Sequence, residues 1–406
     1  MEEKGLMSAG IDIGTKNVRA VLGKVDSDGK VNILGYGEFP STGMRRGVVA
    51  DLETVPGAID SCLLKVEDMS GEKVESAVVS INGSHIISTR TDGMIAVDAM
   101  ERGIENEDLD RLAGVANIGK VPANRETLSL VSHEYTIDGQ SGIKNPVGMN
   151  GSRLEVKAST ISGLVPDCDN LYKVCERAEV QPLALMPAVM AAGRAILTPS
   201  QMENGVAVVD MGATTTGVAV YMDGELQFVS VMPRGANDIT NDLAKVLEVV
   251  PEVAEEIKLR FVSGKFGSGS KDIEVSKENM KMKFKRAEVD EVVEARLEEL
   301  FDGVKRALTV AGYDKRLPEG VILTGGGAKM KDIEAYAQQQ LGMAVRVGAP
   351  HDLTGVGNSV SKPEYAAAVG LLLRGLDDEN AGVGVEKKKT EKKKKSSGKG
   401  FFGLFK

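Results

Sequence analysis

The first eighty residues alternate apolar and polar positions as strands do, and then switch to a helical period. Residues 8–39 carry three stretches with a period of two, which predict antiparallel strands joined by tight turns. Residues 51–70 place Ile59 and Leu63 on the apolar face of a helix. The mostly apolar stretch 74–81 then predicts a buried strand. The predicted order is β-β-β-α-β.

The same order returns in the second half of the chain. Strands are predicted at 206–210, 216–222 and 225–232, followed by helices near 236–249 and 251–261. The repeated order indicates two duplicated domains. The remaining elements predicted for this half are an amphipathic helix at 288–311, a strand at 320–324, a helix at 330–341, a strand at 344–347 and a last apolar helix from Pro363 to about Arg374.

Residues 84–163 interrupt this repeat with alternating stretches and one helix near 108–118, which predicts a small inserted α/β subdomain. Helices return at about 167–179 and 187–197. We therefore expect an α/β fold of two lobes, each built on a mixed five-stranded sheet. The expected boundaries are 1–83, 164–203 and 364–375 for the first lobe, 84–163 for the inserted subdomain, 204–232 and 312–363 for the core of the second lobe, 233–311 for its second subdomain, 376–397 for a flexible linker and 398–406 for an amphipathic segment.

The net charge of −9 is distributed unevenly along the 406 residues. From Glu386 onward the chain carries nine Lys and two Glu, so this end has a charge of +7 and the rest has −16. An acidic folded part argues against a nucleic-acid partner. Three Cys without CxxC spacing and no apolar N-terminal leader predict reduced thiols in the cytoplasm. The longest apolar runs, of about ten residues, are too short to span a bilayer.

A short motif occurs once at the start of each half. Gly10–Lys16 reads GIDIGTK and Val208–Thr216 reads VVDMGATTT, so in both a buried strand ends in Asp before a Gly turn with hydroxyls. Backbone N–H groups and Thr hydroxyls of such turns bind phosphate, and the carboxylates of Asp12 and Asp210 can hold a hydrated Mg²⁺. One copy alone is more often only a turn. Two copies predict a nucleotide clamp.

A third element, Val321–Met330, reads VILTGGGAKM: a buried strand, three glycines and a helix start. The glycines allow the backbone to approach a ligand, or they form only a tight strand-to-helix turn. The chain contains neither the P-loop spacing GxxxxGK[ST] nor the dinucleotide-binding spacing GxGxxG at its first βα turn. Together with the two Asp turns, this element predicts a nucleotide site that is neither a P-loop nor a dinucleotide-binding turn.

The three elements resemble those of the actin/Hsp70/sugar-kinase superfamily, and nearly the whole chain is similar to the FtsA family of actin-like bacterial division proteins. The 133–156 stretch is the most discriminating, because other superfamily members lack it. It resembles the inserted subdomain that the family carries in place of the usual fourth subdomain of actin. The stretches that carry the similarity are GIDIGT at 10–15, HEYTIDGQSGIKNPVGMNGSRLEV at 133–156, VVDMGATTTGVAVY at 208–221, ILTGGGAKM at 322–330 and VRVGAPHDLTGV at 345–356.

The resemblance implies a site for ATP and Mg²⁺, in which Asp12 and Asp210 are the catalytic carboxylates and hold the metal through water. Glu255 and Lys258 would frame the purine and the ribose from the helix at 251–258. Their i, i+3 spacing alone is more typical of a solvated salt bridge. The nucleotide-binding residues that the resemblance implies are Gly14, Thr15, Lys16, Gly212, Ala213, Thr214, Thr215, Glu255, Lys258, Gly325, Gly326, Gly327 and Lys329.

One position departs from the superfamily pattern. Many of its ATPases place an acidic or amide side chain just before a Pro-Ala helix to position the attacking water, whereas this chain has Met186 before Pro187. A thioether cannot act as a general base. We therefore expect ATP binding with at most slow hydrolysis, unless a His, Gln or Asp from elsewhere fills this role.

The last residues combine aromatic and basic side chains, since three of the nine Phe residues fall within the final six positions. On a helix the four large apolar groups would share one face, flanked by Lys. This pattern predicts a segment that binds an anionic membrane surface, although docking on the protein itself or on a partner is an alternative. The membrane-binding residues predicted here are Lys399, Phe401, Phe402, Leu404, Phe405 and Lys406.

The resemblance then implies a filament-forming protein at the cytoplasmic face of the membrane. It would bind the C-terminal peptide of the tubulin-like FtsZ through the 233–311 region, and other division proteins as well. Two alternatives stay open, a pilus-assembly adaptor of the same fold and a small-molecule kinase of the same superfamily. The adaptor would not need the Phe-rich basic tail, and the kinase would need a substrate base. A chaperone like Hsp70 is disfavoured, because no β-rich peptide-binding domain follows the second half.

Overall fold

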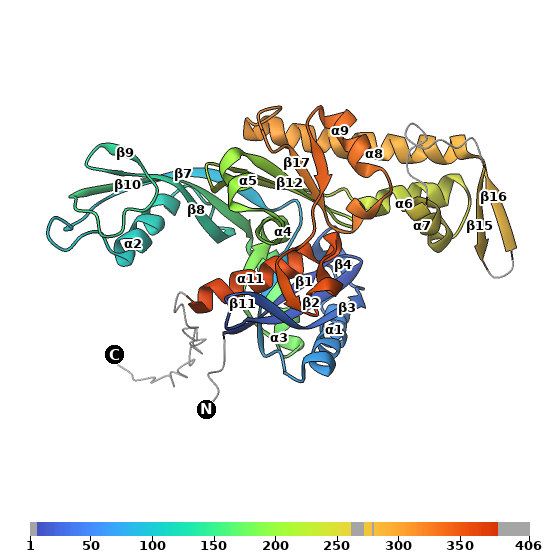
Figure 1. Ribbon diagram of the computed structural model, residues 1–406, viewed down its shortest axis with the longest axis horizontal. Coiled ribbons are helices and arrows are strands. Elements are labelled where there is room, and N and C mark those ends of the chain that lie inside the picture. The colour runs from blue at the N-terminus through green and yellow to red at the C-terminus, as the bar shows by residue number, and fades with distance from the viewer. Residues whose placement is uncertain (1–5, 261–271, 278–279, 381–406) are drawn as a thin grey trace, which may run out of the picture.

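A computed structural model describes residues 6–260, 272–277 and 280–380. Two lobes lie one above the other in Figure 1, and the inserted subdomain extends to one side of them. The first lobe contains a six-stranded sheet in the order β11-β6-β1-β2-β3-β19. Its strands are β1 Met7–Ile13, β2 Asn17–Val25, β3 Val31–Pro40, β6 Ser76–Ile81, β11 Gln181–Pro187 and β19 Leu353–Gly355, with a small pair formed by β4 Met44–Arg45 and β5 Val48–Val49. Its helices are α1 Thr54–Ser70, α3 Val165–Arg177, α4 Ala188–Ile196, α10 Gly357–Val360 and α11 Ala366–Asn380, the last preceded by the 3₁₀ turn η2 Pro363–Tyr365.

The second lobe repeats this sheet. Its five strands β18-β17-β12-β13-β14 correspond one to one with β11-β6-β1-β2-β3, including antiparallel β12–β13–β14 and parallel β12–β17 pairing. The predicted duplication of mixed five-stranded sheets is therefore confirmed. The strands are β12 Val206–Met211, β13 Thr216–Met222, β14 Glu225–Met232, β17 Val321–Thr324 and β18 Val345–Val347, with a separate hairpin of β15 Ile273–Lys277 and β16 Met280–Phe284. The helices are α5 Pro199–Asn204, α6 Ala236–Val246, α7 Pro251–Arg260, α8 Arg286–Ala311, η1 Gly326–Lys329 and α9 Ile333–Leu341.

The inserted subdomain joins the sheet of the second lobe, although chain order places it within the first. It consists of β7 Ile87–Ala96, α2 Asn106–Asn117, β8 Arg125–Ile137, β9 Gln140–Ile143 and β10 Arg153–Leu164. Strand β7 pairs with β14 at Ile87 and Ser230, which produces a continuous nine-stranded sheet. The Lys144 ammonium also donates to the carbonyl of Asp223, at 2.8 Å. Hydrogen bonds thus attach the insertion to the second lobe.

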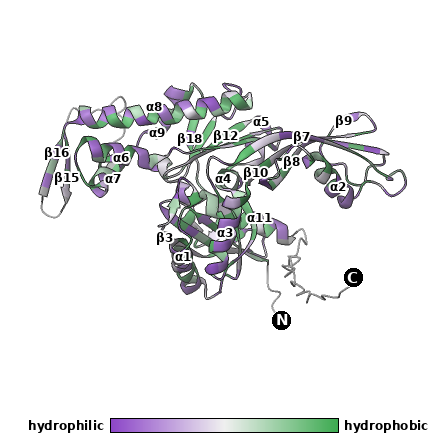
Figure 2. Ribbon diagram, turned by 180° about the vertical axis from the view of Figure 1, so that it is seen from behind, coloured by the Kyte–Doolittle hydropathy of each residue, from purple (hydrophilic) through white to green (hydrophobic). Residues whose placement is uncertain are grey.

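Aliphatic packing holds each lobe together. In the second lobe, α8 buries Val289, Val293, Leu297 and Val304 against the sheet and α9, as its sequence period predicts. Figure 2 shows hydrophobic and hydrophilic residues alternating around this helix. No helix among the described residues has both the length and the apolar character needed to cross a bilayer.

The last helix corrects the predicted linker boundary. We expected the chain to leave the fold at residue 376, but α11 continues to Asn380. Leu376 is buried, and Asp377 and Asp378 pair with Arg194 and Arg374. These contacts stabilise a further helical turn. The change in composition toward Gly and Asp after residue 375 therefore did not mark the end of the helix. The rest of the expected linker and the segment 398–406 lie outside the described residues.

A glycine sets the distance between α11 and α4. A Cβ added at Gly370 would lie 1.7 Å from the carbonyl oxygen of Ala191 in α4, so only glycine permits this approach. We expect Gly370→Ala to lower the free energy of unfolding by about 1–3 kcal/mol, because the helices must move apart. Urea unfolding measures this change. Gly57→Ala in α1, which meets no atom within 4 Å, is the matched control and should stabilise by about 0.5–1 kcal/mol. Equal effects of the two substitutions would contradict this account.

Candidate functional site

The two Asp-Gly turns have the same backbone geometry. The N–H of Gly14 donates to the carbonyl of Asn17 at 3.1 Å, and the N–H of Gly212 donates to the carbonyl of Thr215 at 2.9 Å. Each turn joins the first two strands of its lobe, and each follows a strand that carries Asp one residue before its end. The turns face each other across the lobes, since the hydroxyl of Thr214 donates to that of Thr15 at 2.9 Å.

A cavity of about 260 Å³ lies between the lobes at these turns. The structure brings nearly all of the predicted nucleotide site together around it, from segments more than 300 residues apart. Thr214 does not line the cavity but contacts Thr15 beside it. The predicted residues that line it are Asp12, Gly14, Thr15, Lys16, Asp210, Gly212, Ala213, Thr215, Glu255, Lys258, Gly325, Gly326, Gly327 and Lys329. The predicted membrane residues lie outside the described part of the chain.

The two aspartates form a buried acidic pair at the floor of this cavity. Burial raises the pKa of Asp12, against a hydrogen bond from Ser80 and the charge of Arg19. Burial and then the negative charge of Asp12 raise the pKa of Asp210 to about 7. One carboxylate oxygen of Asp12, Oδ1, is buried and has no hydrogen-bond partner. Two buried carboxylates with an unused oxygen fit a hydrated divalent cation, because hard oxygen ligands suit Mg²⁺.

The glycine-rich turn after β17 closes the cavity beside Asp210. Gly325 has a φ of 81°, and a Cβ at this position would lie 2.3 Å from the Oδ1 atom of Asp210. A side chain here would both strain the backbone and displace the carboxylate. The 3₁₀ turn Gly326–Lys329 follows directly, so its backbone also faces the cavity.

Glu255 and Lys258 form a polar network on the second lobe. Lys258 donates to Glu255 Oε2 at 2.6 Å, and the hydroxyl of Thr240 donates to the same oxygen at 2.6 Å. The side chain of Lys258 is only 3% exposed, so the alternative of a solvated salt bridge is wrong for this residue. Burial alone would raise the pKa of Glu255, but the hydrogen bonds from Lys258 and Thr240 lower it to about 2. Burial lowers the pKa of Lys258 despite its partner.

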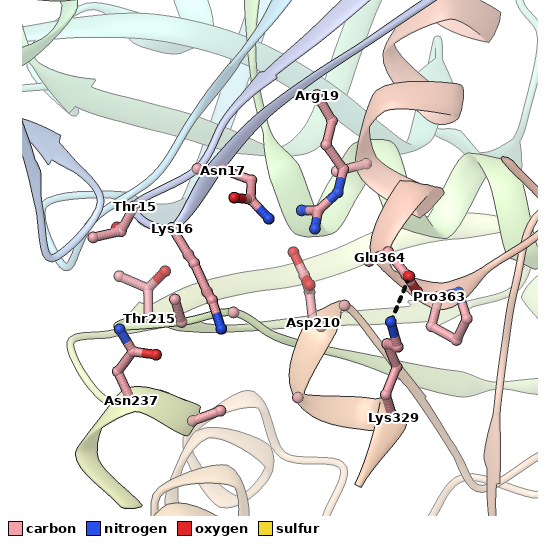
Figure 3. A pocket seen from close by; sticks show the side chains of 18 of the residues that line it. Thr15, Lys16, Asn17, Arg19, Asp210, Thr215, Asn237, Lys329, Pro363 and Glu364 are labelled. Carbon is pink, nitrogen blue, oxygen red and sulfur yellow. Dashed lines mark hydrogen bonds and ion pairs between the residues drawn. The ribbon is translucent and has the colours of Figure 1, made fainter. Parts of the chain in front are cut away.

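Sequence reasoning missed the cations and carboxylates that line the opposite side of the cavity. Arg19 lies on β2 directly opposite Asp12, and it pairs with Glu38 at 3.0 Å. Figure 3 shows its guanidinium pointing down toward Asp210. The available signal was the strand period, because residues two apart on β2 point to the same side. Lys329 also pairs with the buried Glu364 at 2.7 Å, and this contact joins the two lobes.

Met186 directly precedes Pro187 and α4, as expected, but it does not line the nucleotide cavity. It occupies β11 and lines a second cavity, of about 350 Å³, between β8, α4 and β13. The helix predicted at 187–197 is observed as α4, whereas the edge strand formed by the residues before it was not predicted. The lack of a general base at Met186 therefore says nothing about the rate of ATP hydrolysis at this cavity.

Comparison with known proteins identifies the family. A family model described as "Cell division protein FtsA" matches residues 207–370, and one described as "SHS2 domain inserted in FTSA" matches residues 83–162. Cell division protein FtsA of Escherichia coli K12 is 34% identical over 393 residues, which cover 94% of this chain and 93% of that protein. The FtsA of Pseudomonas aeruginosa is 33% identical over 94% of this chain and 92% of its own length.

The chain belongs to the FtsA family of cell division proteins. The FtsA of Bacillus subtilis is 32% identical over 89% of this chain and 82% of its own length, so the similarity extends across distant bacteria. The resemblance noted from the sequence is thereby confirmed, and with it a coarse role in cell division.

Solved structures confirm that this FtsA chain has an actin-like fold. A PilM-PilN type IV pilus biogenesis complex aligns with a TM-score of 0.64 at 17% identity, and covers 91% of this chain and 98% of that one. MreB5 of Spiroplasma citri, described as bound to AMPPNP, aligns with a TM-score of 0.53 at 13% identity, and covers 95% and 100%. At these identities the similarity concerns the fold alone.

The acidic pair generates a pH prediction for this FtsA. Because folding raises the pKa of Asp210 from 3.8 to about 7, the folded state holds a proton that the unfolded state releases between these values. Without a divalent cation, stability therefore falls as the pH rises through this window. We expect Asp210→Asn to raise the free energy of unfolding at pH 8 by roughly 1–3 kcal/mol, since one buried charge is removed. At pH 4 the gain should vanish.

Urea unfolding in EDTA at both pH values measures this difference. Asp223→Asn, in the exposed turn between β13 and β14, is the matched control. It should change the free energy of unfolding only slightly, and by the same amount at both pH values. An Asp210→Asn protein that is less stable than the original protein at pH 8 would contradict the raised pKa.

Proposed function

We propose that this FtsA chain binds ATP with Mg²⁺ and forms filaments. We also propose that it tethers the FtsZ division ring to the cytoplasmic face of the cell membrane as a peripheral protein, and that other division proteins then join it. The observation that carries the proposal is the meeting of two duplicated Asp-Gly turns, from opposite lobes, over one cavity. Membership of the FtsA family favours this function over the pilus adaptor and the small-molecule kinase.

The chemistry of the cavity supports a nucleoside triphosphate. Backbone N–H groups of both turns, the hydroxyls of Thr15 and Thr215 and the cation of Arg19 would surround the phosphates. Mg²⁺, held through water by Asp12 and Asp210, would neutralise the phosphate oxygens. The nucleoside would then lie toward Glu255 and Lys258 on α7, as the resemblance implies.

The proposed tether is the basic, Phe-rich segment 398–406. Burying one Phe or Leu contributes about 1.5–3 kcal/mol, so four half-buried groups supply roughly 3–6 kcal/mol. Each nearby Lys adds about 1 kcal/mol on anionic lipid. A single segment of this kind binds weakly, but the segments of one filament bind together, because each bound neighbour raises the local concentration of the next. A weak anchor therefore suits a protein that polymerises.

The tether and the FtsZ link can be tested together. We expect full-length protein with ATP and Mg²⁺ to recruit a labelled FtsZ C-terminal peptide to vesicles that contain anionic lipid. Deletion of residues 399–406 should abolish recruitment in cosedimentation, since the apolar anchor is lost. Ser396→Ala with Ser397→Ala leaves the anchor intact and should recruit normally. Undiminished sedimentation of the deletion variant with vesicles would overturn the assignment of the membrane anchor to this segment.

We expect ATP hydrolysis to be slow. Apart from Glu255, the carboxylates that line the cavity are engaged, since Asp12 and Asp210 hold the metal in this proposal, Glu38 binds Arg19, and Glu364 binds Lys329. A phosphate-release assay should give a turnover below about 1 per second, the low end of ordinary enzymes. Turnover of many ATP molecules per second would show that one of these carboxylates acts as a general base.

A further inference from the structure

Lys16 connects the phosphate turn of the first lobe to the second lobe. Its ammonium donates to Glu255 Oε1 at 2.9 Å, although the two residues are 239 positions apart. The other oxygen of Glu255 accepts from Lys258 and from Thr240, both at 2.6 Å. Glu255 therefore accepts hydrogen bonds from two lysines at once, the buried Lys258 and the exposed Lys16, and both of its carboxylate oxygens have partners.

The two lysines that bind Glu255 differ in how firmly the surrounding protein holds them. The side chain of Lys258 is 3% exposed and also donates to the carbonyl of Ala236, so it is fixed within α6 and α7. The side chain of Lys16 is 51% exposed, and Figure 3 shows it extending from its turn across the cavity. Lys16 is thus the partner that can exchange Glu255 for another anion.

A polyphosphate placed between the turns would compete directly for this ammonium. Lys16 lies within the turn Gly14–Asn17, next to Thr15, whose hydroxyl meets that of Thr214. A phosphate carries more charge than one carboxylate and offers several acceptor oxygens, so it is the stronger partner for a lysine. Once Lys16 has moved, Glu255 Oε1 becomes a free acceptor, while Lys258 keeps the carboxylate ionised.

We propose that Lys16 is a phosphate-operated latch, which holds Glu255 until a polyphosphate withdraws it and opens that carboxylate to the hydroxyl groups of a nucleoside. The inference rests on the proposed nucleotide site and adds a specificity to it. Recognition of the phosphates and of the nucleoside is coupled through one side chain. A nucleoside without phosphates has to break the Lys16–Glu255 pair unaided, so the site rejects it.

The latch predicts effects of opposite sign for two ligands. In Lys16→Gln, adenosine should bind about twofold to fivefold tighter, because a partly exposed ion pair no longer competes for Glu255. ATP with Mg²⁺ should bind about 10-fold to 100-fold weaker, because a charge-assisted bond to phosphate is lost. A lysine that only binds phosphate would weaken ATP and leave adenosine unchanged. Calorimetric titration of the full-length protein measures both affinities.

Matched variants complete the test. Lys16→Arg keeps the charge and should restore both affinities toward those of the original protein, while Lys30→Gln, in an exposed turn of the same lobe, should alter neither. Adenosine binding that is equal in Lys16→Gln and the original protein, including binding too weak to detect in both, would overturn the latch.

A second readout separates failure of the latch from failure of the nucleotide site. The Lys16–Glu255 pair joins the lobes whether or not ATP is the ligand, so Lys16→Gln should speed amide exchange at 14–17 and 212–215 several-fold without any ligand. Faster exchange in a protein that binds no ATP would support the Lys16–Glu255 link between the lobes but refute the proposed function, and with it the release of that link by phosphate. ATP binding with unchanged exchange would support the nucleotide site and overturn the latch.

Discussion

Two buried carboxylates of the same charge face one cavity, and this unfavourable arrangement organises the rest of the molecule. Asp12 and Asp210 each lie one residue before the end of β1 and β12, the corresponding strands of the duplicated sheets, and burial raises the pKa of both. Buried like charges persist only where a counter-charge compensates them. Arg19 supplies part of it from the neighbouring strand, and the unused oxygen of Asp12 leaves room for a divalent cation. The fold therefore brings together groups that favour a metal-bound anion between the lobes.

At the cavity the lobes meet through a small number of polar contacts, whereas away from it α4 of the first lobe packs on β12 and β13 in an apolar core that both lobes share. Thr15 meets Thr214, Lys16 meets Glu255, and Lys329 meets Glu364. Each contact joins elements that would also touch a phosphate or a nucleoside, so ligand binding and lobe closure use the same side chains. The proposed nucleotide-dependent assembly would require such a connection. The inserted subdomain extends the sheet of the second lobe, so it moves with that sheet as long as the β7–β14 pairing holds.

The sequence was most informative where a pattern was local. The duplicated Asp-Gly turns and the glycine-rich strand end specified the floor of the site, because each needs only a few adjacent residues. Arg19 was missed because its role depends on a partner strand, and the strand period was not applied beyond the turn. Strand β11 was not predicted, since a short apolar run directly before a buried helix cannot be distinguished from the helix by its period. The extension of α11 depends on pairing with Arg194, which lies far away in the sequence. The attachment of the insertion to the second lobe has no local signal at all.

The central claim is that both turns together hold one triphosphate with its metal. Calorimetric titration of the full-length protein with ATP, with and without Mg²⁺, tests it most directly. The account predicts one site per chain, tighter with Mg²⁺, whose affinity rises about tenfold from pH 6 to pH 8 as Asp210 ionises. No heat of binding with Mg²⁺ present, or an affinity that is indifferent to both the metal and the pH, would contradict it.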